Sequence, residues 1–302
     1  MGVNCKDLCG WVGDDKVLLK EATDSLPSDL KQPLRIFGST TPRRMMLFEI
    51  AKKILSQYPD TGTQLIGNCV SWGSNKHALE YLQLMQIAMG SLEEYKYIYS
   101  PYGYGCGRVF IGGNRIWGDG SIGAWQAQAN TKYGSVPVDL DNLPKYSTNV
   151  AKDFGRSEST LNKWTGFGKL HLINGSAKVT TWDQLVDSID NLYPVAVCSN
   201  VGFSMQQYSD GFHRYEDTWN HCMLIIGVDP EYKDPYACIL NSWGDAHGKV
   251  IDFTTKQEWP KGTLRVRKKD IERMLAQDDS FAYSGYSGFP SQELPDDFFD
   301  MI

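Results

Sequence analysis

The chain has 302 residues, of which 41% are hydrophobic, 22% charged and 12% aromatic, a composition typical of a globular protein with a substantial core. Its net charge of −6 argues against the basic surface by which nucleic acids and anionic membranes are bound. No apolar run approaches the roughly 20 residues that span a bilayer, and the start, "MGVNCKDLCGWVGDD", lacks the basic and apolar regions of a secretory signal. We therefore expect no nucleic-acid partner, no membrane segment and no secretion.

The seven cysteines are odd in number and irregular in spacing, which argues against a disulfide framework and favours a reducing, cytoplasmic location. Cys5 and Cys9 could form half of a metal site, but no second Cys/His pair follows at zinc spacing, so we expect no metal.

The first half of the chain is mainly helical by pattern. Residues 43–58 form one amphipathic stretch, and a second helix is expected over 70–89, with a core face of Ala78, Leu79, Leu82, Met85 and Ile87. Residues 97–117, rich in Gly and Tyr, are interpreted as a loop, and 142–170 as surface loops. Between them, "GAWQAQANTKYG" predicts a helix that ends near Gly134.

The second half changes character. Thr181 and Gln184 stand at capping-box spacing before a periodic helix, and four strand-like runs follow, "PVAVCS", "HCMLIIGVD", "ACILNSW" and "TLRVRK". A helical half followed by a strand-rich half predicts an α+β fold. We divide the chain into an extension (1–60), a main domain (61–276) and an acidic, aromatic tail (277–302) that is interpreted as solvated or docked on a partner.

Two short motifs carry little weight. The stretch "GDGSIGA" at 118–124 matches the dinucleotide pattern, but no strand precedes it and no βαβ unit surrounds it, so no dinucleotide cofactor is expected. The N-glycosylation sequon at Asn174 carries no prediction, because the sequence shows no secretion signal.

Cys69 stands directly before the second predicted helix, and taken alone it is most simply a core residue. A helix N-terminus, however, lowers the pKa of a thiol and so favours the nucleophilic thiolate. Gly67 would let a substrate backbone approach closely. Gln64 could offer its side-chain amide to a developing oxyanion, beside the backbone N–H of Cys69.

A nucleophilic cysteine needs a base and a group that orients the base. Of the five histidines, His221 opens an apolar strand, whereas the others lie in the predicted helix or in polar, loop-like surroundings. Asn241 ends the next strand, so adjacent strands could place it beside His221, with Trp243 covering their hydrogen bond.

These pieces together resemble the papain family of cysteine peptidases. "QLIGNC" at 64–69, "WNHCMLIIGV" at 219–228 and "NSWG" at 241–244 stand in the family's order, and "GDGSIGAWQAQANTKYGSVP" resembles its glycine-containing substrate loop and following helix. The resemblance covers roughly residues 61–270. It implies a two-lobed fold with the active site between a helical and a barrel-like β-rich lobe, and acyl transfer through a thioester without metal or cofactor.

Carried over by resemblance, Cys69 is the nucleophile, His221 the base and then acid, Asn241 the orienting residue and Gln64 a member of the oxyanion hole. The resemblance also places at the substrate site a further set: Gly67, Gly118, Gly120, Trp219, Asn220 and Trp243. The sequence departs from the family in having one residue fewer between the glutamine and the cysteine. Of the four catalytic assignments, that of Gln64 therefore has the weakest support from the motif.

Two other functions stay open at this stage. One is a Cys/His amidase acting on cell-wall peptides, and the other is a papain-fold binding or structural protein without turnover. The expected partner is a protein or peptide substrate. The missing signal favours an intracellular or virus-borne protein, and either terminus could lie across the cleft.

Overall fold

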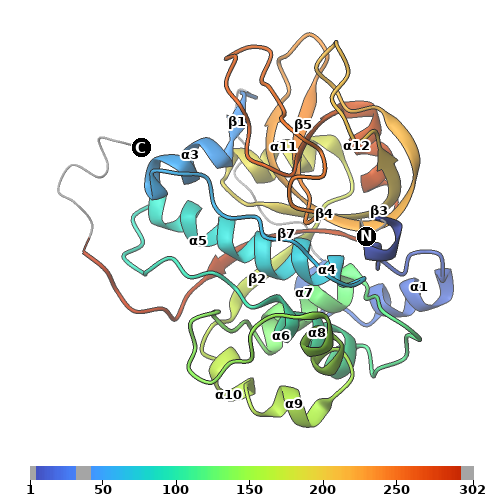
Figure 1. The fold of residues 1–302 in the computed structure, drawn as a ribbon, viewed down its shortest axis with the longest axis vertical. Coiled ribbons are helices and arrows are strands. Elements are labelled where there is room, and N and C mark those ends of the chain that lie inside the picture. The colour runs from blue at the N-terminus through green and yellow to red at the C-terminus, as the bar shows by residue number, and fades with distance from the viewer. Residues whose placement is uncertain (1–4, 32–41, 294–302) are drawn as a thin grey trace.

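The computed structural model describes residues 5–31 and 42–293, which form an α+β fold of two lobes (Figure 1). Helices α6, α8, α9 and α10 gather at one end of the molecule, β5 lies with α11 and α12 toward the other, and α4, α5, α7, β4 and β7 lie between them. In the described ranges, no helix has both the length and the apolar character to cross a membrane.

The helices follow one another along the chain as η1 (Cys5–Leu8), α1 (Lys16–Asp24), α2 (Ser28–Lys31), α3 (Leu47–Leu55), α4 (Cys69–Ser71), η2 (Trp72–His77), α5 (Ala78–Ala88), α6 (Ser100–Gly105), η3 (Cys106–Ile111), α7 (Gly123–Lys132), α8 (Thr148–Phe154), α9 (Glu158–Asn162), α10 (Thr165–Gly168), α11 (Trp182–Asp190) and α12 (Lys268–Leu275). The strands are β1 (Met45–Met46), β2 (Ile173–Lys178), β3 (Val195–Phe203), β4 (Tyr215–Asp229), β5 (Tyr236–Leu240), β6 (Thr263–Arg267) and β7 (Ser280–Tyr286).

The strands form one antiparallel sheet in the order β2-β7-β3-β4-β5-β6, with β1 paired to β4. Residues 195–199 of β3 and 221–229 of β4 are buried without alternation. Such continuous burial means that both faces of the sheet are covered there. Helices α11 and α12 contact β3, and the central helical run contacts β3 and β4 through η2.

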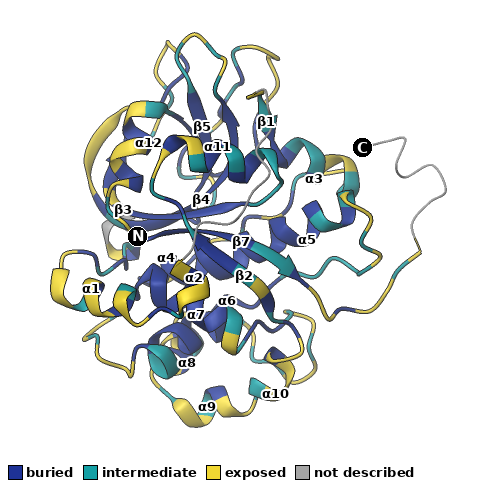
Figure 2. Cartoon of the chain, turned by 180° about the vertical axis from the view of Figure 1, so that it is seen from behind, coloured by how far each residue is buried: buried dark blue, intermediate teal, exposed yellow. Residues whose placement is uncertain are grey.

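The central helical run consists of α4, η2 and α5, and it is buried on all sides from Cys69 to Met85 (Figure 2). The expected helix over 70–89 is therefore present, but the expectation of a single core face was too narrow. Its middle turns, η2, are π-helical, a geometry frequent at functional sites.

Several local predictions are confirmed. Helix α7 ends at Lys132 before Gly134, and Thr181 caps α11 by accepting a hydrogen bond from the backbone N–H of Gln184. Each of the four predicted strand-like runs overlaps one of strands β3 to β6, although β5 ends at Leu240, before the NSW part of its run.

The loop predicted over 97–117 is wrong for residues 100–111, which form α6 and η3. Pro101 at the first turn is compatible with a helix. The glycines serve close packing: a Cβ atom added at Gly103 would overlap the Asn75 side chain, and one at Gly105 would overlap Leu161. Tertiary packing outweighs the low helix propensity of glycine here.

The surface loops predicted over 142–170 are also wrong, because α8, α9 and α10 lie there. Ser147 and Ser157 cap α8 and α9 by accepting backbone N–H groups. These helices are short, and each buries little apolar surface, which explains the weak periodic signal.

The tail interpreted as solvated is wrong for residues 280–286. They form β7, between β2 and β3 in the sheet, and Phe281, Ala282 and Tyr283 are buried. Residues 294–302, the remainder of that predicted tail, lie outside the described residues, as do 1–4 and 32–41. Within 1–60, α3 packs against α5 and β1 pairs with β4.

The place of β7 can be tested with Ala282→Asp. Ala282 pairs with Val195 and Ala177 and is fully buried, so an uncompensated carboxylate there should cost about 3–5 kcal/mol of unfolding free energy. Ser284→Asp, at a half-buried position of the same strand, is the control and should cost much less. Urea unfolding followed by circular dichroism measures both, and equal small losses would contradict the assignment.

Candidate active site

Cys69 is the first residue of the central helical run and its side chain is fully buried. Helix α4 contacts β4, and the thiol interacts with the backbone amide of Cys222, the residue after His221. The first turn of the helix and the middle of β4 therefore bring Cys69 and His221 into one neighbourhood.

The thiol is nevertheless neutral in this structure. Burial raises the pKa of Cys69 well above its usual value, and Cys222 and Cys9 raise it further, against backbone amides of Cys222 and Gly10 that lower it. The expected lowering by the helix N-terminus is wrong for this state, because the cost of burying a thiolate exceeds the effect of the helix.

His221 and Asn241 lie side by side. The Nε2 atom of His221 is 2.8 Å from the Oδ1 atom of Asn241, and Asn241 directly follows β5, which pairs with β4. Asn241 Oδ1 also accepts a hydrogen bond from the backbone N–H of Ser242. An amide oxygen held in this way requires a proton on Nε2 and leaves Nδ1 of His221 as the acceptor.

That acceptor is buried, and it has no hydrogen-bond partner in the part of the chain that the structure describes. Burial lowers the pKa of His221 to about 4, and the hydrogen bond to Asn241 works in the opposite direction. The imidazole is therefore neutral near pH 7, with a lone pair available on Nδ1.

Trp243 packs against His221, with the ring centroids 4.6 Å apart and the ring planes tilted by 34°. Trp219 packs behind it against Trp243 and Phe203 and is only 4% exposed, so the structure places Trp219 in an aromatic cluster.

A further histidine belongs to this group. The side-chain amide of Asn241 donates to Nε2 of His247, 2.7 Å away, and His247 stacks on Trp243. The sequence places His247 in polar, loop-like surroundings and so gives no sign of this role. His247 follows Asn241 by only six residues, but these residues form an irregular turn. No periodic pattern in the sequence predicts that such a turn places His247 beside Asn241.

Gln64 is buried and fully engaged. Its Oε1 accepts from the hydroxyl of Ser242, and its Nε2 donates to the carbonyl oxygens of Ile66 at 2.8 Å and Leu8 at 2.6 Å. The amide predicted to hold an oxyanion thus already contacts a peptide carbonyl, that of Leu8.

Leu8 belongs to a segment, Leu8–Val12, that crosses the predicted site. The backbone N–H of Trp11 donates to Asn220 O at 2.9 Å, and Gly10 O accepts from Ser121 N at 2.8 Å. A Cβ atom added at Gly10 would overlap the carbonyl oxygen of Gly67. Glycine at both positions permits this close crossing, and the segment helps to bury Cys69.

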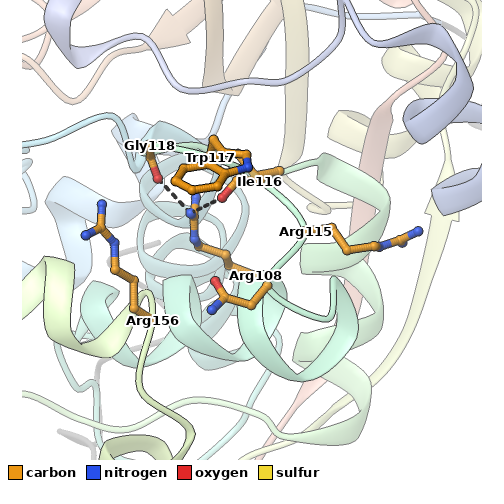
Figure 3. A pocket seen from close by; sticks show the side chains of 7 residues that line it. Arg108, Arg115, Ile116, Trp117, Gly118 and Arg156 are labelled. Atoms are coloured by element: carbon orange, nitrogen blue, oxygen red, sulfur yellow. Dashed lines mark hydrogen bonds between the residues drawn. The ribbon is translucent and has the colours of Figure 1, made fainter.

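The segment lies along the loop that contains Gly118 and Gly120. Val12 N donates to Ser121 O at 3.0 Å, which makes a parallel bridge between Trp11 and Ser121. The buried guanidinium of Arg108 holds this loop by donating to the carbonyls of Ile116 and Gly118 at 2.5 and 2.6 Å, beneath the exposed Trp117 (Figure 3). A third hydrogen bond reaches the carbonyl of Gly120.

Comparison with known proteins shows which family this chain resembles. A model of the papain family of cysteine proteases matches residues 117–258. Over these residues the chain is similar to that family. The papain-family match includes His221 and Asn241 and begins after Cys69 and Gln64, and no curated protein matches the chain significantly in sequence.

Solved structures show the same papain-like fold. Xylellain, a cysteine protease from Xylella fastidiosa, is 14% identical with a TM-score of 0.55, over 94% of this chain and 98% of that one. ProCathepsin B S9 from Trypanosoma congolense is 11% identical with a TM-score of 0.56, over 95% and 88% of the two chains. Digestive procathepsin L 3 of the Tenebrio molitor larval midgut is 15% identical with a TM-score of 0.53, over 89% and 78%.

The contact between Asn241 and His247 predicts an effect on His221. In His247→Ala, the Asn241 amide loses its acceptor and can rotate, so His221 should populate both neutral tautomers. Imidazole 15N chemical shifts measure the tautomers. In His247→Gln, the new side-chain oxygen can accept from the Asn241 amide, so His221 should keep its proton on Nε2. If His221 also keeps a single tautomer in His247→Ala, His247 does not orient Asn241.

Four buried histidines predict acid sensitivity. Burial lowers the pKa to about 3 for His77 and His213 and to about 4 for His221 and His247. Because the unfolded chain binds their protons below about pH 6.5, the unfolding free energy should fall on acidification, by about 2 kcal/mol per histidine at pH 5.

Buried Asp279, whose pKa burial raises to about 6, works in the opposite sense but offsets only part of this loss. Urea unfolding at pH 7 and pH 5 measures the difference. His77→Gln, which can still donate to the Thr61 carbonyl, should shrink the difference, and equal stability at both pH values would contradict the prediction.

Proposed function

We propose that the protein hydrolyses peptide bonds with Cys69 as nucleophile, His221 as base and then acid, Asn241 as the orienting residue and Gln64 in the oxyanion hole. The observation that carries the proposal is the hydrogen bond between His221 and Asn241. It fixes the proton on Nε2 and leaves a buried Nδ1, which has no partner among the described residues, in the neighbourhood of the helix start that carries Cys69.

The chemistry follows from these atoms. His221 Nδ1 takes the thiol proton as the sulfur of Cys69 bonds to the substrate carbonyl carbon, and the resulting imidazolium is stabilised by Asn241 Oδ1. The oxyanion is held by Gln64 Nε2 and the backbone N–H of Cys69, which at a helix N-terminus lacks an intrahelical acceptor.

Collapse of this intermediate breaks the C–N bond, and His221 returns its proton to the leaving amine. A thioester remains on Cys69. Water, deprotonated by His221, then attacks the thioester and releases the acid and the thiol.

The contact of Gln64 with the Leu8 carbonyl supports this assignment, because it is the contact that a substrate carbonyl would make. It also implies that Leu8–Val12 must leave the site before a substrate can enter. The proposed enzyme is thus latent in this conformation, with its thiol neutral and covered.

The test compares wild type with Trp11→Ala in two measurements, the rate of alkylation of Cys69 and the rate of substrate cleavage. Trp11 is buried and anchors the covering segment, so its removal should expose the thiol. A peptidyl epoxide should label Cys69 at least about tenfold faster in Trp11→Ala, in line with loss of a buried anchor. Casein cleavage should rise in parallel and vanish in Trp11→Ala/Cys69→Ala.

Trp117→Ala is the matched control, since this tryptophan is 98% exposed and should leave both rates unchanged. If Cys69 labels rapidly in Trp11→Ala but neither casein nor peptidyl substrates are cleaved, the peptidase proposal fails. Cleavage of peptidoglycan fragments instead would assign the amidase.

A further inference from the structure

Leu8–Val12 is held as a bound peptide would be. Its backbone pairs with Ser121 on one side, and its Trp11 N–H donates to Asn220 O on the other. Pairing of an extended peptide through its main chain leaves the choice of sequence to the side-chain pockets. The side chain in question is that of Trp11.

Trp11 is only 2% exposed and belongs to the hydrophobic core, so its indole fills an enclosed space, called here the Trp11 pocket. Gly13 turns directly over the ring, where an added Cβ atom would overlap the indole carbons. At the far end of the pocket, the indole Nε1–H donates to the Oδ2 atom of Asp279 at 2.7 Å.

Asp279 is fully buried, immediately before β7. Its Oδ2 also accepts from Gly123 N at 2.7 Å, and its Oδ1 accepts from Ala124 N at 2.8 Å, both at the start of α7. The carboxylate is therefore satisfied by N–H donors, and one of the three comes from the occupant of the pocket.

This arrangement sets what an occupant must supply. A side chain that fills the pocket but has no N–H group leaves Oδ2 short of a donor in a buried place, and unpaired buried acceptors discriminate strongly between otherwise similar ligands. The shape of the pocket therefore favours a flat aromatic ring, and the buried carboxylate of Asp279 favours a ring that carries an N–H donor at its edge.

We propose that the pocket that holds Trp11 selects peptides with a tryptophan side chain, whose indole N–H donates to Asp279. This rests on the proposed function, because the peptide would lie in the same cleft along Ser121 and Asn220. Leu8–Val12 is then the intramolecular competitor that such a peptide displaces.

The contacts also place the selected residue relative to the cleaved bond. The thiol of Cys69 interacts with the backbone amide of Gly10, one residue from Trp11, and Gln64 contacts the carbonyl of Leu8. A tryptophan in the pocket should therefore lie within about three residues of the scissile carbonyl, which is the separation of Trp11 from Leu8.

The experiment measures binding without chemistry. The full chain carrying Trp11→Ala and Cys69→Ser presents an emptied pocket and no nucleophile. Fluorescein-labelled peptides Gly-Ala-X-Gly-Ala, with X as tryptophan, 3-benzothienylalanine, phenylalanine or lysine, are titrated by fluorescence anisotropy. Benzothienylalanine is the matched control, since it keeps the shape of the indole and replaces the N–H with sulfur.

The tryptophan peptide should bind about tenfold or more tightly than the benzothienylalanine peptide, as expected for a hydrogen bond to a buried carboxylate. Asp279→Asn should reduce the preference for the tryptophan peptide over the benzothienylalanine peptide. If Asp279→Asn does not fold, the comparison of the two peptides in Trp11→Ala/Cys69→Ser still tests the proposal. Equal affinities, tightest binding of the lysine peptide or no binding of any peptide would overturn the proposal.

The two proposals fail separately. If the tryptophan peptide binds selectively but is not cleaved by Trp11→Ala with Cys69 intact, the subsite stands and the peptidase proposal fails. If peptides are cleaved without regard to tryptophan, the peptidase stands and the subsite proposal is overturned.

Discussion

The two lobes meet over a helical run that is buried along its length, and the rest of the structure is arranged to satisfy that burial. Buried polar side chains need partners where water cannot reach, and several in this run have them. Lys76 pairs with Glu80 at 2.5 Å, and Glu80 accepts from the backbone N–H of Ile98 at 2.8 Å. Ser71 donates to the Ser100 carbonyl at 2.7 Å, which ties α4 to α6. The burial that makes the core is thus the same burial that positions Cys69.

Burial also sets the chemistry of the site. Cys69 and His221 are both fully enclosed, and enclosure favours the neutral form of each. A reactive ion pair requires a partial return of solvent or of a polar ligand. The contacts of Leu8–Val12 with Gln64, Ser121 and Asn220 occupy the places where a substrate would supply such polar groups. The segment Leu8–Val12 therefore both covers the site and helps to keep Cys69 and His221 in their neutral forms.

The part of the site that regular elements carry could be predicted from the sequence. His221 in an apolar strand and Asn241 at the end of the next strand meet because antiparallel neighbours align, and their contact has the expected geometry. His247, Trp11 and Asp279 could not be predicted in the same way. Each reaches its partner through a turn, a long crossing or a strand inserted from the C-terminal region, and none of these leaves a periodic pattern.

The sequence by itself determined the order of Cys69, His221 and Asn241, the strands β3 to β6 and helices such as α7 and α11, since local periodicity and capping residues encode them. Only the tertiary structure decided that the glycine-rich stretch from Ser100 to Ile111 is helical and that β7 lies inside the sheet, because packing against distant residues outweighs local propensity. It likewise decided the protonation of Cys69. That depends on how much water remains around the sulfur, which is fixed by a segment about sixty residues away in the sequence.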